Sequence, residues 1–392
     1  MSRILAINAG SSSLKFALFE DASGFRRLRR GEVTAIGRPN ATLSVSGAGQ
    51  PETAKRAVSA PDHAAAAHIL MDAVGGDALT AVGHRLVHGG PAYSAPQRID
   101  SGMIAGLREL IAFDPEHMPQ ALSLIEAVRG RFPDLPQVAC FDTAFHHDLP
   151  RVARLLPIPR RYEAKGVRRY GFHGLSCTFL MGELTRLDGE PAAAGRVVLA
   201  HLGGGASLTA VQGGKSIDTS MSFTPASGIP MSTRSGDLDP GLMAWLARTE
   251  DMTPDQFAEM VTFKSGLLGI SETSGDMADL LGREAEDVRA AEAVAIFCYQ
   301  ARKWIGAFAA ALGGLDILVF AGGVGENAPV VRARICEGLG FIGVALDEAA
   351  NAANAPVIST DAGRVKVRVI HTDEEVVIAR SVAQVLGLGG AG

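Results

Sequence analysis

Two segments half a chain apart repeat one plan of strand, short polar turn and strand, and this repeat constrains the fold most. The first is ILAINAGSSSLKFALFE at residues 4–20, and the second is VVLAHLGGGASLTAV at residues 197–211. In each segment two apolar runs flank a turn made of small residues. A chain of 392 residues is also long enough to form more than one hydrophobic core. The repeat therefore predicts two related domains.

Strand-like runs alternate with helical ones along the rest of the chain, which predicts a mixed α/β protein. Residues 293–312 carry apolar side chains at helical spacing and predict a helix with one buried face. The sequence TPDQ at 253–256 predicts a capped start for another helix. Prolines cluster from Pro150 onward, so we expect one domain over 1–149 and a second over 150–379. A C-terminal helix near 380–392 is expected to pack back on the first domain.

Composition excludes several classes of partner. The formal charge of −5 and the pI near 6.1 give no basic field for nucleic acid, so small molecules are the expected ligands. We find no secretory leader and no run of eighteen apolar residues, so neither secretion nor a membrane span is expected. Four scattered cysteines have no metal-ligand spacing and predict reduced packing thiols in a cytoplasmic protein: Cys140, Cys177, Cys298 and Cys336.

The first turn is longer and more polar than a chain reversal requires, since a hairpin loop needs only about two residues. Its small residues let backbone N–H groups approach an anion, Ser11 and Ser13 add hydroxyl donors, and Lys15 adds charge. Taken alone, the stretch fits a solvated hairpin equally well. The second turn, LGGGAS at 202–207, favours phosphate binding, because two such turns facing each other would hold a polyphosphate.

A third glycine-rich segment, AGGVGENAP at 321–329, follows an apolar run and precedes a helical stretch. We predict a turn there, in which glycine allows close approach of a nucleotide and the next helix favours negative charge. The segment matches neither the dinucleotide-binding pattern nor the P-loop.

Seven motifs in order make the chain similar to the acetate kinase family, within the superfamily of acetate and sugar kinases, heat-shock ATPases and actin. They are INAGSSSLKF (7–16), GHRLVHGG (83–90), FDTAFH (141–146), YGFHG (170–174), MSTRSGDLDP (231–240), AGGVGENAP (321–329) and TDEEVVIAR (372–380). The resemblance implies two ribonuclease-H-like, actin-like ATPase domains with an active-site cleft between them, and a homodimer. It also implies transfer of a phosphoryl group from ATP to acetate or another short carboxylate, with Mg²⁺, or Mn²⁺ as an alternative.

The resemblance implies catalytic roles for four residues. Arg85 and Arg234 match the arginines that bind the carboxylate and the transferring phosphoryl group, His173 matches a transition-state contact, and Asp142 matches the organiser of the magnesium network. A carboxylate attacking a γ-phosphate needs charge neutralisation and positioning, and no general base. Planar guanidinium groups suit both anions. Outside the match, each arginine is more often a surface charge or an ion pair, and a loop histidine is as often structural.

The substrate and metal assignments also follow from the resemblance. His117 matches a second histidine near the substrate, and an apolar recess for the acyl group is expected from Val87, Phe172 and Pro225. Glu116 stands where the family usually has leucine. It turns outward, pairs with a cation, or selects a polar substrate; we favour the first two, because flanking prolines constrain its loop.

At the C-terminal end, Thr372 and Glu375 have the spacing of a capping box that opens a helix. This gives Glu375 a structural role and leaves Glu374 for magnesium, which usually keeps several waters. The family match assigns Glu374 and Asn8 to the metal.

The resemblance assigns these residues to nucleotide and phosphate binding: Ser11, Ser13, Lys15, His201, Leu202, Gly203, Gly204, Gly205, Asp276, Met277, Ala278, Gly322, Gly323, Val324, Gly325 and Asn327. By spacing alone His201 is structural or peripheral, as are His84, His88, His146 and His147, because they form no metal-ligand set. Gly204 replaces a usual asparagine, and Met277 and Ala278 replace a usual Phe-Arg pair. These departures leave pyrophosphate open as the donor, although ATP is preferred.

Two other functions compete with acetate phosphorylation. A propionate or butyrate kinase would share nearly all of these residues and differ in pocket volume. A nucleotide-dependent binding protein of the actin or chaperone type would share the phosphate turns, but it would not need the set of Arg85, Arg234 and His173.

Overall fold

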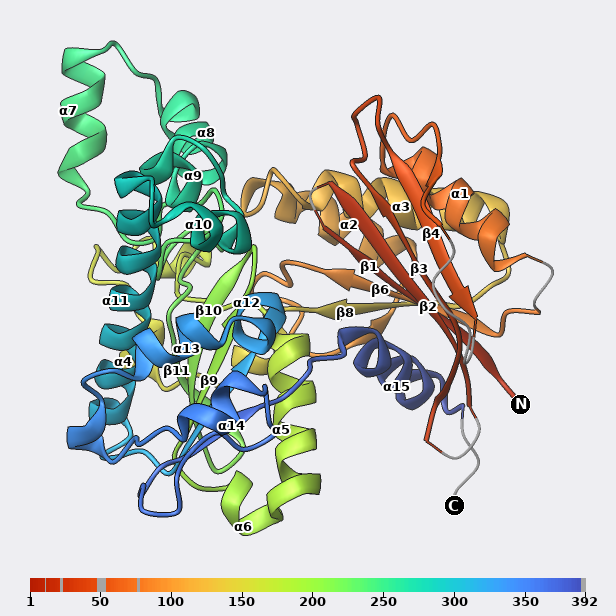
Figure 1. Cartoon of the computed structure of the whole chain (residues 1–392). Helices are drawn as coiled ribbons and strands as arrows, with labels where there is room; N and C mark the ends of the chain where they lie inside the picture. Colours follow the sequence, from red (N-terminus) through yellow and green to blue (C-terminus); the bar gives the residue numbers. More distant parts are fainter. Residues whose placement is uncertain (11, 22–23, 48–53, 76–77, 389–392) are drawn as a thin grey trace. The chain divides into compact units, whose positions relative to one another are not determined.

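The computed structural model describes residues 1–10, 12–21, 24–47, 54–75 and 78–388 (Figure 1). The chain forms two compact units. Unit 1 consists of Met1–Phe145 and Asp373–Gly392, and unit 2 consists of His146–Thr372. The chain crosses from unit 1 to unit 2 between Phe145 and His146, just before the proline cluster. It returns to unit 1 between Thr372 and Asp373, earlier than the return expected near residue 380.

Unit 1 contains an eight-stranded mixed sheet in the order β5-β4-β3-β2-β1-β6-β8-β7. The strands are β1 (Arg3–Ala9), β2 (Ser13–Glu20), β3 (Arg26–Thr34), β4 (Thr42–Gly47), β5 (Arg56–Ala57), β6 (Ala81–Leu86), β7 (Gln97–Arg98) and β8 (Gln137–Phe141). Strands β1 and β2 form the predicted antiparallel hairpin, with Asn8 opposite Lys15. Strands β1, β6 and β8 run parallel, so the carboxyl ends of these three strands meet at one edge of the sheet.

Helices cover both faces of this sheet (Figure 1). They are α1 (His63–Val74), α2 (Ser101–Glu109), the short helix η1 (Leu110–Ala112), α3 (Met118–Arg131) and α15 (Glu374–Leu386). Helices α1 and α3 pack over one face, and α15 packs against β1, β2, β6 and β8. Helix α15 packs closely on β6, because a Cβ atom on Gly83 of that strand would lie 2.4 Å from Ile378 of the helix.

Unit 2 repeats the plan with a five-stranded mixed sheet in the order β11-β10-β9-β12-β13. The strands are β9 (Val197–Leu202), β10 (Ala206–Gln212), β11 (Lys215–Thr219), β12 (Ile317–Ala321) and β13 (Lys366–Val369). Strands β9 and β10 form the second predicted hairpin, and β9, β12 and β13 are parallel. The prediction of two mixed α/β sheets with related strand plans is confirmed.

The remaining elements belong to unit 2, except η2 (Ala144–His146), which contains the point where the chain crosses from unit 1 to unit 2. They are α4 (Arg151–Arg154), η3 (Glu163–Lys165), α5 (Gly174–Asp188), α6 (Glu190–Ala193), α7 (Gly241–Thr249), α8 (Pro254–Phe263), α9 (Gly266–Ser271), α10 (Met277–Arg283), α11 (Val288–Ala311), α12 (Gly322–Asn327), α13 (Pro329–Cys336), η4 (Gly340–Ile342) and α14 (Glu348–Ala352). Helix α11 buries Phe297, Ile305 and Phe308 as predicted, and Thr253 caps α8 in a capping box with Gln256.

The four cysteines and the membrane prediction can also be checked in the structure. All four cysteines are buried. Within the described ranges, we find no helix with the length and apolar character needed to cross a bilayer.

Candidate active site

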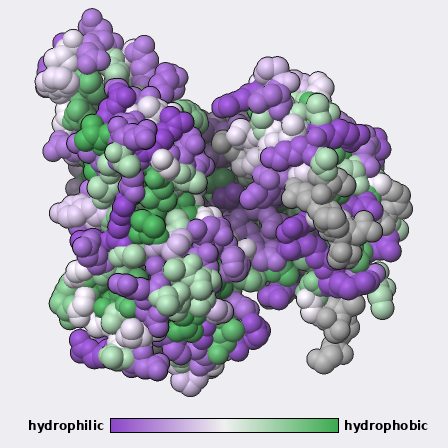
Figure 2. All heavy atoms as spheres, viewed as in Figure 1, coloured by the Kyte–Doolittle hydropathy of each residue, from purple (hydrophilic) through white to green (hydrophobic). Residues whose placement is uncertain are grey.

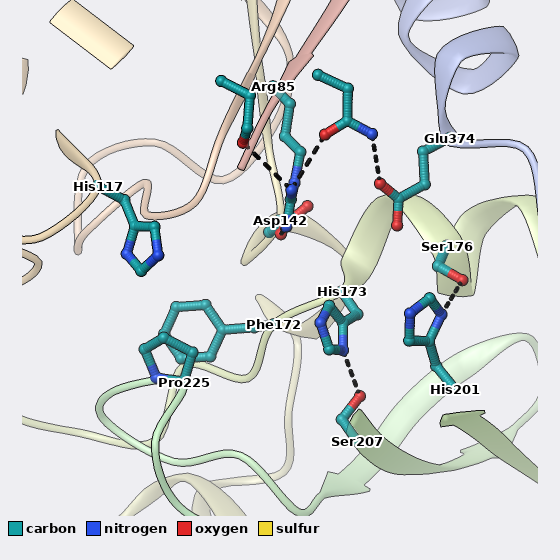
Figure 3. A network of polar contacts seen from close by, with 12 residues as sticks. Arg85, His117, Asp142, Phe172, His173, Ser176, His201, Ser207, Pro225 and Glu374 are labelled. Carbon is teal, nitrogen blue, oxygen red and sulfur yellow. Dashed lines mark hydrogen bonds and ion pairs between the residues drawn. The ribbon is translucent and has the colours of Figure 1, made fainter. Parts of the chain in front are cut away.

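Unit 1 gathers ionic groups at the carboxyl ends of its parallel strands. Arg85, near the end of β6, donates from Nε and Nη2 to Asp142 Oδ2 at 3.0 and 2.6 Å (Figure 3). Its Nη1 donates to Asn8 Oδ1 at 3.0 Å. Asp142 directly follows β8, and its side chain is almost completely buried. Burial raises the pKa of the Asp142 carboxyl, and Arg85 opposes that rise. Burial also disfavours charged Arg85, but Asp142 and Glu374 more than offset this and raise its pKa.

Two carboxylates meet on the other side of Asn8. The amide Nδ2 of Asn8 donates to Glu374 Oε2 at 2.8 Å and to Glu375 Oε1 at 3.0 Å. The pKa of Glu375 is raised, first by burial and then by the charge of Glu374. Two carboxylates so close together favour a bound cation, because a cation relieves their repulsion.

The predicted capping box at the start of α15 is wrong. The N-cap residue is Asp373, whose side chain accepts from Val376 N at 3.1 Å, and the helix begins at Glu374. Thr372 bonds instead to Ser176 Oγ. Sequence spacing could not separate the two caps, because an aspartate one position later offers the same acceptor. Glu375 is therefore released from capping and joins Glu374 at Asn8.

The residues of this cluster fit a magnesium ion. Asp142 Oδ1 is buried and has no hydrogen-bond partner in the described part of the chain, so one hard oxygen ligand is unused. No group of three or more His, Cys, Asp or Glu that could hold a metal by itself occurs in the ranges that the structure covers. Magnesium suits such a site, because it commonly takes one or two carboxylates and completes its shell with water and substrate phosphates.

The first phosphate turn also lies in unit 1. Gly10 N donates to Ser13 O at 2.8 Å, and the ring of His63 contacts Gly10 O at 2.9 Å. Lys15 is exposed on β2, and its charge opposes the raised pKa of Glu375. Ser11 lies outside the described residues.

His117, just before α3, pairs with a residue that the sequence had not singled out. Its Nδ1 lies 2.8 Å from Asp114 Oδ1, and both side chains are largely buried. The charge of His117 also acts on Asp142, lowering the pKa of that carboxyl. Val87 is buried near the end of β6, and Glu116 is half-buried and engaged in an interaction of its own.

Unit 2 places His173 in a strained position at the start of α5. Its φ of 57° lies in the left-handed region, which costs energy for a non-glycine residue. The residue is only 8% exposed. Its Nδ1 contacts Ser207 Oγ at 2.9 Å (Figure 3). Strain that is held by surrounding packing is frequent at functional sites.

The second phosphate turn brings His173 and Arg234 to one point. A Cβ atom on Gly205 would lie 3.1 Å from His173 Nε2 and 3.5 Å from Arg234 Nη1. Ser232 N donates to Gly204 O at 3.2 Å, which joins the turn to the loop of Arg234. That loop is braced further, because Gly266, with φ of 60°, packs directly on the Arg234 backbone. The glycine turn therefore lies against an imidazole and a guanidinium group, which a side chain at Gly205 would crowd.

A second histidine lies behind His173. The rings of His173 and His201 are 4.4 Å apart, and His201 Nδ1 contacts Ser176 Oγ at 2.8 Å. Ser176 Oγ also contacts Thr372 Oγ1 at 2.9 Å. This chain of hydrogen bonds fixes the His201 ring from one side.

The third glycine-rich segment is helical, which corrects the predicted turn. Gly322 to Asn327 form α12 directly after β12, because Gly322, with φ of 75°, turns the chain at once. A Cβ atom there would lie 2.7 Å from Leu202 O, so only glycine fits against β9. Glu326 Oε1 accepts from Gly322 N at 2.9 Å and from Thr372 N at 3.1 Å.

The predicted adenine-side residues have structural roles as well. Asp276 is the N-cap of α10 and accepts from the backbone N–H of Ala278. Met277 is buried in unit 2, whereas Ala278 is exposed. Asn327 donates to Gly323 O at 3.0 Å, and Val324 lies on the same short helix.

The predicted acyl-pocket residues of unit 2 differ in burial. Phe172 is buried and Pro225 is half-buried. Pro225 O accepts from Arg234 Nη1 at 3.3 Å, so the recess residue and the arginine belong to one loop system. His146 Nε2 contacts Phe172 O at 2.9 Å, and burial lowers the pKa of His146 to about 4. His146 is thus a structural histidine, as its spacing suggested.

The sequence did not single out several residues whose contacts orient the assigned side chains and turns. They are His63, Asp114, Ser176, Ser207, Glu326 and, as a site residue, Glu375. Only Asp114 and Glu375 carried a local signal, since each neighbours an assigned residue. The other contacts join distant parts of the chain, and no local pattern could reveal them.

Comparison with known proteins identifies the family of this chain. A profile of the acetokinase family matches residues 3–380. The chain is 43% identical to a propionate kinase of Citrobacter rodentium, covering 98% of this chain and 96% of that one. It is 42% identical to an acetate kinase of Rhodopseudomonas palustris, covering 97% of each.

Solved structures agree. A propionate kinase from Francisella tularensis superposes with a TM-score of 0.91 at 33% identity, covering 97% of this chain and 99% of that one. Porphyromonas gingivalis acetate kinase gives a TM-score of 0.87 at 34% identity, covering 98% and 100%. The chain therefore belongs to the acetokinase family, a family of phosphotransferases.

Proposed function

We propose that the protein transfers the γ-phosphoryl group of ATP to acetate, giving acetyl phosphate and ADP. A carboxylate oxygen forms the new bond to phosphorus, the bond from phosphorus to the β-phosphate oxygen breaks, and the electron pair leaves with ADP. No proton is gained or lost in this exchange. The observation that carries the proposal is that His173 Nε2 and Arg234 Nη1 both lie against the Gly205 turn.

In unit 1, Arg85 supplies the charge that receives the acetate carboxylate. Its guanidinium group is already oriented by Asp142 and Asn8, so little conformational entropy is lost when the anion binds. Asn8, Glu374 and the unused oxygen of Asp142 would hold magnesium, directly or through water. Bound magnesium neutralises phosphate charge and helps to align the phosphates.

In unit 2, donors are directed at the equatorial oxygens of the moving phosphoryl group. His173 contacts Ser207 through Nδ1, and its Nε2 lies at the Gly205 turn. Arg234 offers a charged N–H beside it, and the glycine turn at 203–205 lets backbone N–H groups approach. Donors fixed in advance at such oxygens are the main source of rate in phosphoryl transfer.

Propionate is the second candidate acceptor, because the relative with 43% identity is named a propionate kinase. Hydroxylamine trapping of the acyl phosphate would separate the candidates, using acetate, propionate and butyrate with ATP or pyrophosphate. We expect the highest kcat/KM with acetate and ATP. Product with propionate alone, or with pyrophosphate alone, would overturn the assigned acceptor or donor, and no product from any pair would overturn the kinase proposal.

A homodimer is part of the proposal. Large apolar side chains are exposed on unit 2, among them Trp245 on α7, Phe263 on α8 and Tyr299 on α11. Figure 2 shows green patches over the part of unit 2 that carries these helices. Exposed apolar patches of this kind commonly mark protein interfaces. Light scattering after size exclusion should give twice the chain mass, and Trp245→Asp should reduce it; a wild-type monomer would remove this part of the proposal.

A further inference from the structure

Arg27 on β3 lies beside the start of α15, and a bulge in β3 explains why it faces that helix. Phe19 of β2 pairs with Arg27. Its neighbour Leu18 pairs with Arg29, so Leu28 is the extra residue of a β-bulge, a device that redirects side chains. Leu28 packs on the core to which α1 contributes, and Arg29 donates to two carbonyl groups at the end of that helix. Arg27 is left to the opposite face, where α15 packs.

The guanidinium group of Arg27 has two partners. Its Cζ lies 5.2 Å from the centroid of the Phe19 ring, which is buried. Its Nη2 donates to Asp373 Oδ2. The two charged side chains are 32% and 27% exposed, so water screens their attraction in part. A planar guanidinium group held over an aromatic ring is already oriented, and it loses less conformational freedom when it pairs.

Asp373 uses its two carboxylate oxygens for two different contacts. Oδ2 accepts from Arg27, while Oδ1 accepts from Val376 N at 3.1 Å and caps α15. Fixing one oxygen also orients the other, because a carboxylate group is planar. The cap is therefore tied to strand β3. The helix begins with Glu374 and Glu375, and both of these side chains contact the amide of the proposed magnesium site.

Three consecutive carboxylates make this helix start sensitive to charge. Burial raises the pKa of Glu375, and the charges of Glu374 and Asp373 raise it further. One carboxylate at a helix N-terminus is stabilising, but several in sequence also repel one another. Repulsion favours fraying of the first turn, whose backbone N–H groups have no acceptor within the helix. The positive charge of Arg27 on Asp373 opposes this repulsion where the helix begins.

We propose that Arg27 is a positioning residue for the magnesium site: by pairing with Asp373, it fixes the first turn of α15 before the cation binds. Glu374 then needs little rearrangement to reach the ion. The inference rests on the proposed function for the identity of the cation, and it gives a role to a residue outside the seven motifs. Loss of the pair should loosen the cap and raise the magnesium concentration that the site requires.

The sign of the magnesium effect separates positioning from simple electrostatics. If Arg27 acted only through its charge, Arg27→Gln would remove a repelling cation and lower the magnesium requirement. If it positions α15, Arg27→Gln should raise the half-maximal magnesium concentration several-fold. Two titrations measure this: initial rates, and the rise in melting temperature that magnesium causes without nucleotide. An unchanged or lower requirement in the rates would overturn the inference.

Two variants serve as controls. Asp373→Asn keeps a good N-cap but loses the ion pair, so it should raise the magnesium requirement with little loss of stability. It should add little in the Arg27→Gln background, and a full additional effect there would contradict the proposal. Arg26→Gln breaks the ion pair of the preceding residue with Glu20, whose atoms are 2.6 Å apart. It should leave the requirement unchanged, and an effect as large as that of Arg27→Gln would likewise overturn the inference.

Amide hydrogen exchange gives a readout that needs neither activity nor magnesium. The N–H of Val376, which donates to the cap, should exchange faster in Arg27→Gln than in the wild type and at the wild-type rate in Arg26→Gln. Arg27→Lys keeps the charge without the planar group over Phe19, and its intermediate protection covers the case in which Arg27→Gln fails to fold. Wild-type protection of Val376 in both Arg27 variants would overturn the inference. If the wild type phosphorylates no carboxylate, the proposed function fails, and the same exchange rates still decide whether Arg27 fixes the helix start.

Discussion

The two units share a strand plan, yet their site groups differ in kind. Unit 1 presents ionisable groups, with Arg85 against Asp142 and with Glu374 and Glu375 against one amide. In unit 2 His173 and His201 form hydrogen bonds to serine hydroxyl groups, and the turn beside them is made of glycine. The difference indicates that a duplicated fold kept its backbone plan while the two turns acquired separate chemistry. Unit 1 suits a cation and a small anion, and unit 2 suits phosphate oxygens.

The two arginines give the largest expected effect. Arg85→Ala and Arg234→Ala should each lower kcat/KM by about 10² to 10³-fold, the loss typical of one preorganised donor to a developing charge. Only Arg85→Ala should also unfold more easily, by about 3 kcal/mol, because it leaves Asp142 buried without its cation. Kinetics and thermal melts of both variants test this. Near-normal turnover in folded Arg234→Ala would remove its catalytic assignment, and equal melting temperatures would erase the contrast between the units.

Each unit also contains a buried histidine that makes stability depend on pH. Burial lowers the pKa of His84 in unit 1 and His146 in unit 2 to about 4, from 6.5 in the unfolded chain. Unfolding then takes up protons between these values, so stability is complete above pH 6.5 and falls as pH drops toward 4. The expected loss is about 3 kcal/mol for each histidine.

Urea unfolding from pH 7 to pH 4 measures this loss. His84→Gln, in unit 1, and His146→Gln, in unit 2, should each make the free energy of unfolding depend less steeply on pH. A wild-type stability that rises as pH falls over this range would contradict the assignment of both residues as neutral buried groups.

Magnesium dependence tests the separate roles of Glu374 and Glu375 in unit 1. Glu374→Gln should raise the magnesium concentration for half-maximal activity by about tenfold, as expected for loss of a residue that holds the ion. Glu375→Gln should have a smaller effect and should stabilise the metal-free protein, because it removes one of two repelling carboxylates. Magnesium titrations of activity and of melting temperature distinguish them. If Glu375→Gln had the larger effect on magnesium, the roles would be exchanged.

The glycine turn sharpens the description of unit 2. Gly205→Ala should lower kcat several-fold, because its Cβ would lie 3.1 Å from His173 Nε2 and would crowd the imidazole assigned to the phosphoryl group. Gly182→Ala, on α5 and outside the turn, is the matched control, since its Cβ would meet no atom within 4 Å. Equal kcat values for the two variants would contradict a role of the Gly205 turn in catalysis.

The smallest effect is expected from the acyl pocket. Glu116→Leu should lower the KM for acetate, because a half-buried carboxylate close to His117 repels an anionic substrate. Initial rates over a range of acetate concentrations measure it. Loss of activity on a hydroxylated or amino-substituted carboxylate, in an enzyme that ignores acetate, would instead make Glu116 the specificity residue.

The sequence predicted the fold well where the pattern was local. Alternating apolar runs revealed both hairpins, and Thr253 with Gln256 revealed the start of α8. The motif match selected Arg85, Asp142 and His173, and burial and hydrogen bonding now show how each is held.

Failures occurred where distant contacts override a local rule. The N-cap of α15 is Asp373 and not the predicted Thr372, and Asp373 also pairs with Arg27 from β3. The segment after β12 became helical because Gly322 had to clear the backbone of β9. Neither constraint is visible within a few residues of the position that it decides.

The return of α15 to unit 1 has a consequence for biosynthesis. Asn8 and Glu374 are 366 residues apart, yet they share a hydrogen bond, and α15 covers strands near the start of the chain. A nascent chain therefore holds an unfinished N-terminal core throughout the synthesis of unit 2. Helix α15 can cover these strands only after it leaves the ribosome, so Asn8 and Glu374 first meet when synthesis is almost finished.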